Sequence, residues 1–194
     1  MPHELPKLVK AVDQEPNIYI RSAIWLLLLT GLRKMELLSA KWEDVMWERG
    51  QLRLPNTKSG EEQFASLSAA AMAILQSIPK REGNPYIIPG AWRGQHLKRI
   101  DPAWSRITSA AGVQDLQIHD LRRTAGSWMT QAGVDLNTIK DALRQGHSVQ
   151  NRNVGVNSMG EQRQSKGIYD KIGRWDRRRT NPDPKEIELL KVRR

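Results

Sequence analysis

The chain has 194 residues, of which 39% are apolar, so it is long enough to bury the core of one domain. A net charge of +10 indicates a polyanionic partner, for which nucleic acid is the leading candidate. Because the chain has no cysteine, disulfides and zinc sites with cysteine ligands are excluded, which suits a reducing compartment.

The first part of the chain predicts two helices, over residues 4–14 and 17–30. The second is apolar on nearly every side, so we expect it at the centre of the core, with Gly31 as its C-cap. Its apolar run, residues 23–29, is the longest in the chain and far shorter than the roughly 20 residues that a membrane helix needs.

Arg33 follows this helix directly and precedes a short helix that carries Glu36, Leu37 and Leu38. A position beside a rigid buried element can hold a guanidinium fixed, as recognition of a phosphate requires. On position alone, a surface arginine near a helix end is the more common explanation.

Residues 45–67 have the pattern of strands around a polar turn at 56–60, with apolar positions Leu52, Leu54, Phe64 and Leu67. We expect a β-hairpin or a small three-stranded sheet with Lys58 at the hairpin tip. A lysine at such a tip is usually only solvated.

The middle of the chain predicts a helix over residues 68–78 and then a loop over 79–94 with a short strand at 86–88. Residues 95–112 predict a helix that is interrupted at Asp101-Pro102. Its inner stripe is Trp104, Ile107 and Ala111.

Two further helices are predicted between residues 118 and 147, with Asp120 as the first N-cap and Gly133 between them. Their apolar stripes are Leu121, Ala125, Trp128 and Ala132, and then Leu136, Ile139 and Leu143. Helices joined by so short a turn fold back as an αα-hairpin.

This hairpin would bring the start of its first helix beside the end of its second. His119 and Arg122 are three residues apart and share one helical face. We therefore expect both to lie near His147. Beyond them come a polar loop over residues 148–166, Tyr169, a basic helix and a final helix at 183–194.

Together these features resemble the catalytic domain of the tyrosine recombinase (phage integrase) family. TGLRKMELLSAKWEDV (30–45) is similar to the family's first arginine box, and HDLRRTAGSWMTQAG (119–133) to its second. NTKSG (56–60) is similar to the β-hairpin segment that bears its lysine, and RQGH (144–147) to the segment that bears its last histidine.

The resemblance implies an α+β fold that is mainly α-helical, with a small antiparallel sheet near residues 45–67. Residues 1–194 would form one catalytic domain, with residues 183–194 as a carboxy-terminal helix or tail. The family normally carries an amino-terminal domain that clamps the DNA, so we expect the chain to be a fragment without that domain.

The implied activity is that of a site-specific DNA recombinase or integrase, which cuts and rejoins DNA through a 3′-phosphotyrosyl intermediate. Arg33 and Arg122 would stabilise the charge on nonbridging phosphate oxygens, and His147 would donate a further hydrogen bond. His119 would act as base or proton shuttle, and Lys58 would protonate the departing 5′ oxygen. Neither a metal ion nor a cofactor is required.

Tyr169 is the expected nucleophile. In many family members a tyrosine follows the final histidine closely, but residues 154–156 here are Val, Gly and Val. Some members have a longer spacer, and the segment GIYDK around Tyr169 resembles theirs. Tyr19 and Tyr86 are the alternatives, and both belong to earlier structural segments; Tyr169 could instead only pack its ring on the domain.

The expected partner is double-stranded DNA in the cytoplasm of a bacterium, with the enzyme bacterial or phage-encoded. The family assembles as a tetramer on DNA, and the chain could be a monomer without DNA. The alternatives are a decayed integrase that only binds DNA and a type IB topoisomerase. A metal-dependent nuclease would need clustered carboxylates, whereas the acids here are scattered.

Overall fold

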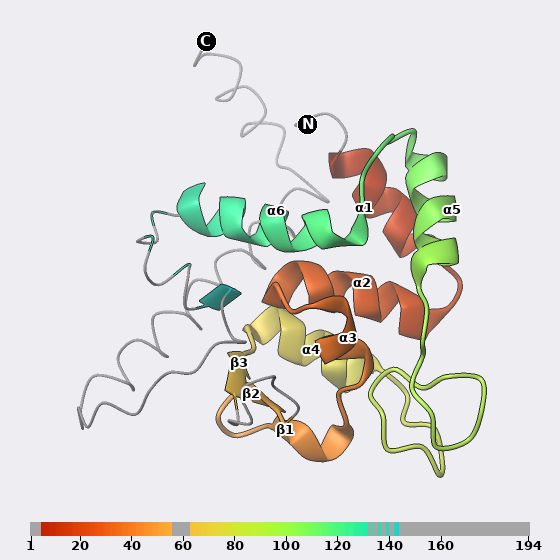
Figure 1. The fold of residues 1–194 in the computed structure, drawn as a ribbon, viewed down its shortest axis with the longest axis vertical. Helices are drawn as coiled ribbons and strands as arrows, with labels where there is room; N and C mark the ends of the chain where they lie inside the picture. Colours follow the sequence, from red (N-terminus) through yellow and green to blue (C-terminus); the bar gives the residue numbers. More distant parts are fainter. Residues whose placement is uncertain are drawn as a thin grey trace.

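The computed structural model describes residues 5–55 and 63–131, together with positions 133, 136, 139, 142 and 143. Within them, six helices form most of the fold, and a small antiparallel sheet of three strands, in the order β1-β2-β3, lies at one end beside α4 (Figure 1). The predicted α+β class, mainly helical, is confirmed. Among the described residues, none of the helices has the length and apolar character to cross a membrane.

Helix α2 (Ile18–Thr30) is the centre of the core, as predicted. Its buried positions cover most of its circumference: Ser22, Ala23, Ile24, Leu26, Leu27, Leu28, Leu29 and Thr30. The Asn17 side chain caps its start by accepting hydrogen bonds from the N–H groups of Tyr19 and Ile20. Gly31 ends it at φ 65°, a left-handed conformation that favours glycine.

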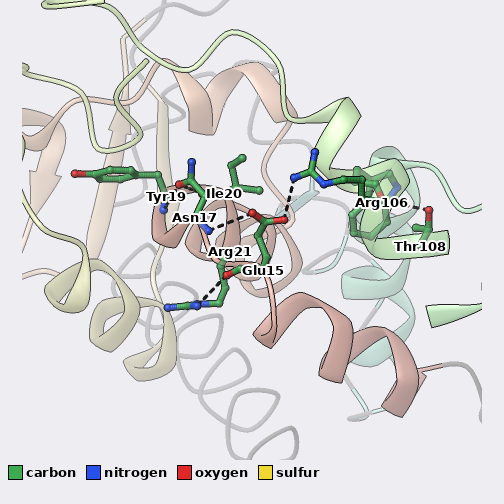
Figure 2. A network of polar contacts seen from close by, with 8 residues as sticks. Glu15, Asn17, Tyr19, Ile20, Arg21, Arg106 and Thr108 are labelled. Atoms are coloured by element: carbon green, nitrogen blue, oxygen red, sulfur yellow. Dashed lines mark hydrogen bonds and ion pairs between the residues drawn. The ribbon is translucent and has the colours of Figure 1, made fainter. Parts of the chain in front are cut away.

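A polar network at Glu15 ties the junction between α1 (Leu5–Asp13) and α2 to helix α5 (Asp101–Ala111) (Figure 2). The buried Glu15 carboxylate accepts the Asn17 N–H at 3.2 Å and an Arg106 Nη2–H at 3.3 Å. The Glu15 carbonyl accepts from Arg21 Nη1 at 2.9 Å. These contacts give the buried carboxylate the hydrogen-bond partners it needs and link the α1–α2 junction to α5.

Helix α3 (Lys34–Leu38) is the short helix predicted after Arg33. A 3₁₀ turn (Trp42–Asp44) follows it and leads into the sheet. The strands are β1 (Val45–Met46), β2 (Gln51–Leu54) and β3 (Gln63–Ser66).

The predicted three-stranded sheet is confirmed, but Phe64 does not belong to its buried face. Arg53 stands opposite Phe64, and Leu52 stands opposite Ala65. Leu52 and Ala65 are each 1% exposed, whereas Phe64 is only half-buried. Side chains alternate along a strand, so Phe64 and Leu67, three residues apart, could not share one face.

Helix α4 (Ala69–Ser77) begins at a Ser68 side-chain cap, close to the predicted bounds. The helix predicted from residue 95 is wrong before Asp101. There the chain folds back on itself, with the Leu97 N–H donating to the Ile88 carbonyl at 2.8 Å. Because the Leu97 N–H is used in this contact, it is not available for the i→i−4 hydrogen bond of a helix. The strand predicted at 86–88 is reduced to an isolated bridge between Lys41 and Tyr86.

Trp104, Ile107 and Ala111 form the buried stripe of α5, as predicted. Helix α6 (Ile118–Gln131) buries the predicted Leu121, Ala125 and Trp128. The predicted N-cap is wrong, because Asp120 lies inside the first turn. Its Oδ2 atom caps the helix from there by accepting the Gln117 N–H at 2.9 Å.

Beyond α6, the described positions 136, 139, 142 and 143 are all helical, in agreement with the predicted second helix. Ile139 is 6% exposed, but Leu136 is 64% exposed and does not belong to the predicted inner stripe. Leu143 packs where there is little room: a Cβ atom at Gly31 would lie 2.7 Å from its Cδ2, and one at Gly126 would lie 2.9 Å from its Cδ1. Leu143 thus packs the helical segment after α6 against the end of α2 and against α6 itself.

We predict that Gly31→Ala destabilises the fold more than Gly112→Ala. Both glycines end helices at nearly the same φ, 65° and 67°, so both substitutions cost about 1–2 kcal/mol of left-handed strain. Only the Gly31 substitution also meets Leu143, since nothing lies within 4 Å of a Cβ at Gly112. Leu143 Cδ2 is the end of a side chain that can shift, so this contact adds about 1 kcal/mol, the lower end of the cost of overpacking. Urea denaturation measures both losses, and equal losses would contradict this packing.

Candidate active site

A groove of about 610 Å³ lies between α3, the start of α5 and the start of α6. Its lining is largely apolar and includes Leu27, Leu32 and Trp104. Its polar lining comes from three separate parts of the sequence: Arg33, Lys34, Asp101, Gln117, His119 and Arg122. The fold therefore brings Arg33 together with His119 and Arg122.

Arg122 is anchored to the end of α2. Its Nη1 atom donates a hydrogen bond of 2.6 Å to the Gly31 carbonyl oxygen, across 91 positions of sequence. Carbonyls at a helix C-terminus lack intrahelical partners and carry partial negative charge, so they favour a cation there. The contact places the second arginine box against the chain two residues before Arg33.

Arg33 is held by Glu36. The Glu36 carboxylate accepts the Arg33 backbone N–H at 2.8 Å and the Arg33 Nη1–H at 2.7 Å. The Arg33 side chain remains 46% exposed. Exposed ion pairs add little stability, so the main effect of this contact is to restrict where the guanidinium points. Sequence reasoning missed this role of Glu36, although an acid three residues into a helix is a capping-box signal.

His119 lies in the first turn of α6, three residues before Arg122. Its ring is exposed and lines the groove. The first turn of a helix presents N–H groups and partial positive charge, which favour a bound anion. The imidazole and this helix start therefore border the same part of the groove.

An ion pair closes one wall of the groove. Lys34 Nζ lies 2.9 Å from Asp101 Oδ1, which joins α3 to the first residue of α5. The Lys34 hydrogen bond is the main reason why the pKa of the Asp101 carboxyl is below its ordinary value. The Asp101 carboxylate therefore stays ionised to a lower pH than an ordinary aspartate, and the pair persists over the same range.

The other three predicted site residues, Lys58, His147 and Tyr169, lie outside the described residues. The predicted proximity of His147 to His119 and Arg122 therefore stays a prediction. Within the described part of the chain, no group of three or more His, Asp or Glu side chains could hold a metal ion.

The sequence pattern of the phage integrase family matches residues 1–152. The chain belongs to the phage integrase family. The resemblance of the two arginine boxes is thereby confirmed at the level of the family.

Among curated relatives, the integrase of Salmonella phage P22 is 26% identical over 156 residues, which are 72% of this chain and 38% of that protein. The shufflon-specific DNA recombinase of Escherichia coli is 31% identical over 139 residues, 71% of this chain and 34% of that protein. The chain thus spans only about a third of the length of these two integrase-family proteins.

Solved structures agree in fold. The integrase from mycobacterium phage Brujita has 25% identity and a TM-score of 0.63, over 85% of this chain and 56% of that one. A lambda integrase dimer bound to a COC′ core site has 22% identity and a TM-score of 0.57, over 76% of this chain and 56% of that one. Both are similar to this chain in the catalytic fold of tyrosine recombinases.

We predict that Glu36→Ala destabilises the protein by about 1 kcal/mol, because it removes a helix-capping acceptor. Glu36→Gln should lose less, since its amide oxygen can still accept the Arg33 N–H. Glu43→Ala is the matched control, because Glu43 pairs with Lys41 on the surface and caps no helix start. Urea midpoints measure the three variants. A Glu36→Ala protein as stable as the control would show that this cap contributes nothing.

Proposed function

We propose that this chain carries the catalytic machinery of a site-specific DNA recombinase, which cuts and rejoins DNA through a 3′-phosphotyrosyl intermediate. The observation that carries the proposal is the groove in which Arg33, His119 and Arg122 meet. Two arginines and a histidine at one site suit a phosphodiester whose negative charge increases during reaction. Membership of the phage integrase family supports the same chemistry.

The two arginines bind the nonbridging oxygens of the scissile phosphate. Their planar guanidinium groups offer forked N–H donors, which match a phosphate better than a lysine ammonium does. Charge grows on these oxygens as the pentacoordinate transition state forms. Donors that are already fixed, Arg33 by Glu36 and Arg122 by the Gly31 carbonyl, need little reorganisation at that moment.

Tyr169 attacks the phosphorus, and its phenolic proton passes to His119. The phenol has an ordinary pKa of about 10, so a proton acceptor beside it raises the fraction of reactive phenolate at neutral pH. His147 donates a further hydrogen bond to the phosphate, and Lys58 protonates the departing 5′ oxygen. The P–O bond to tyrosine replaces the P–O bond of the DNA, so a 5′ hydroxyl can later reverse the step without ATP or a metal ion.

Residues 1–194 act as one catalytic unit on double-stranded DNA in the cytoplasm. We propose a tetramer on two duplexes as the recombining assembly, since a lambda integrase tetramer has been solved on a Holliday junction. The net charge of +10 suits this partner, and binding should weaken steeply as salt rises.

Two other functions make different experimental predictions. A type IB topoisomerase would relax supercoiled plasmid without joining two marked sites, whereas a recombinase exchanges them. A decayed integrase would bind DNA and form no covalent adduct.

We predict that Tyr169→Phe abolishes covalent attachment to a nicked duplex that carries the recombination site, because it removes the attacking oxygen and little else. DNA affinity should stay within about twofold of the parent, since a single neutral hydroxyl contributes little to binding. Denaturing gels measure the adduct, and Tyr86→Phe is the matched control. An adduct that persists in Tyr169→Phe would place the nucleophile elsewhere; a parent chain that binds but forms no adduct would favour the decayed integrase.

A further inference from the structure

The loop between α4 and α5, residues 79–100, presents an exposed tryptophan at its tip. Trp92 is 75% exposed, more than any other large hydrophobic side chain in the described part of the chain. The loop extends away from α1 and α6, at the lower right of Figure 1. Tryptophan is enriched in binding interfaces relative to the rest of a protein surface.

The tip, residues 91–94, is held by hydrogen bonds on both sides. The Gly90 N–H donates to the Gln95 carbonyl at 2.7 Å, and the buried Asn84 side chain donates to the same carbonyl at 2.9 Å. Arg81 Nη1 donates to the Gly90 carbonyl at 2.6 Å. A Cβ atom at Gly90 would lie 2.5 Å from the His96 carbonyl oxygen, so the two sides approach as closely as glycine allows. Trp92 therefore stands on an ordered support.

Exposed cations lie on this loop, and Arg99 also acts electrostatically on the nearby Asp101 carboxylate. Arg93, Lys98 and Arg99 are exposed, and none of them takes part in an ion pair among the described residues. Glu82 is the sole acid in residues 79–100, against five lysines and arginines. A basic loop with an exposed aromatic ring is complementary to a polyanion that also has apolar rings.

The basic residues lead directly to the groove. Lys98 and Arg99 precede Asp101, which lines the groove and pairs with Lys34. The nine steps from Trp92 to Asp101 span at most about 30 Å. The whole surface therefore lies within about one helical turn of duplex, roughly 34 Å, from a phosphate bound in the groove.

We propose that Trp92, Arg93, Lys98 and Arg99 form a second DNA-contact surface, which grips the duplex beside the scissile phosphate. Lys98 and Arg99 neutralise backbone phosphates, and the Trp92 ring packs on deoxyribose and base edges. This inference rests on the proposed function, since it takes the same duplex as partner. The excess of five lysines and arginines over one acid in residues 79–100 favours DNA over a protein partner.

The test is fluorescence anisotropy of the full chain on a random-sequence duplex of about three helical turns, ~30 base pairs. Trp92→Ala should weaken binding by about fivefold to fiftyfold, and Trp92→Tyr by much less, because a ring remains. Lys98→Ala with Arg99→Ala should lower the slope of log affinity against log salt by about 1.8, or about 0.9 for each lost phosphate contact.

The matched control is Lys7→Ala with Lys10→Ala, which removes the same charge from α1. Its slope should stay near that of the parent chain, and thermal unfolding should be unchanged in every variant, since the substituted side chains are exposed. Unchanged affinity in Trp92→Ala together with an unchanged slope in the double variant would overturn the inference. A Trp92→Ala chain that keeps its affinity for duplex but no longer self-associates would also overturn the inference.

The inference and the proposed function fail in different ways. If the parent chain binds duplex and forms the tyrosyl adduct, and the loop variants bind equally well, only the inference about the loop surface is refuted. If the parent chain has no affinity for duplex, both the loop inference and the proposed function are refuted.

Discussion

The hydrogen bond from Arg122 to the Gly31 carbonyl is the contact on which the site depends. It joins the first turns of α6 to the end of α2, the most deeply buried helix described. Gly31 can serve there because its φ of 65° ends the helix and leaves its carbonyl without an intrahelical partner. Leu143 packs on the same glycine. Gly31 thus ends α2, accepts the Arg122 hydrogen bond and leaves room for Leu143 of the helical segment after α6.

Each charged group in the groove is held by a different contact, and together they produce a fixed electropositive site. Glu36 restricts Arg33, the Gly31 carbonyl holds Arg122, and the Lys34–Asp101 pair links α3 to α5. Such contacts contribute modestly to the free energy of folding, because exposed ion pairs are screened by water. Their larger effect is on geometry, since donors that are fixed before reaction stabilise developing charge most effectively.

Much of this fold could be predicted from the sequence, because its helices have periodic apolar stripes and clear caps. Predictions were wrong where distant contacts decide the conformation. Residues 95–100 are not helical because Leu97 bonds to Ile88, and Phe64 faces away from the core because its strand register pairs it with Arg53. The convergence of Arg33, His119 and Arg122 followed from family motifs, but the Gly31 carbonyl contact has no local signal and could not be predicted.

We propose that Arg33 and Arg122 stabilise negative charge on a phosphate bound between α3 and α6. The most direct measurement compares covalent attachment of parent and Arg122→Ala chains to a normal scissile phosphate and to a neutral methylphosphonate at the same position. We predict a loss of about 10² to 10³ in rate on the phosphate and a much smaller loss on the methylphosphonate. An equal loss on both substrates would contradict this role of Arg122, because it would show that Arg122 acts only through the fold.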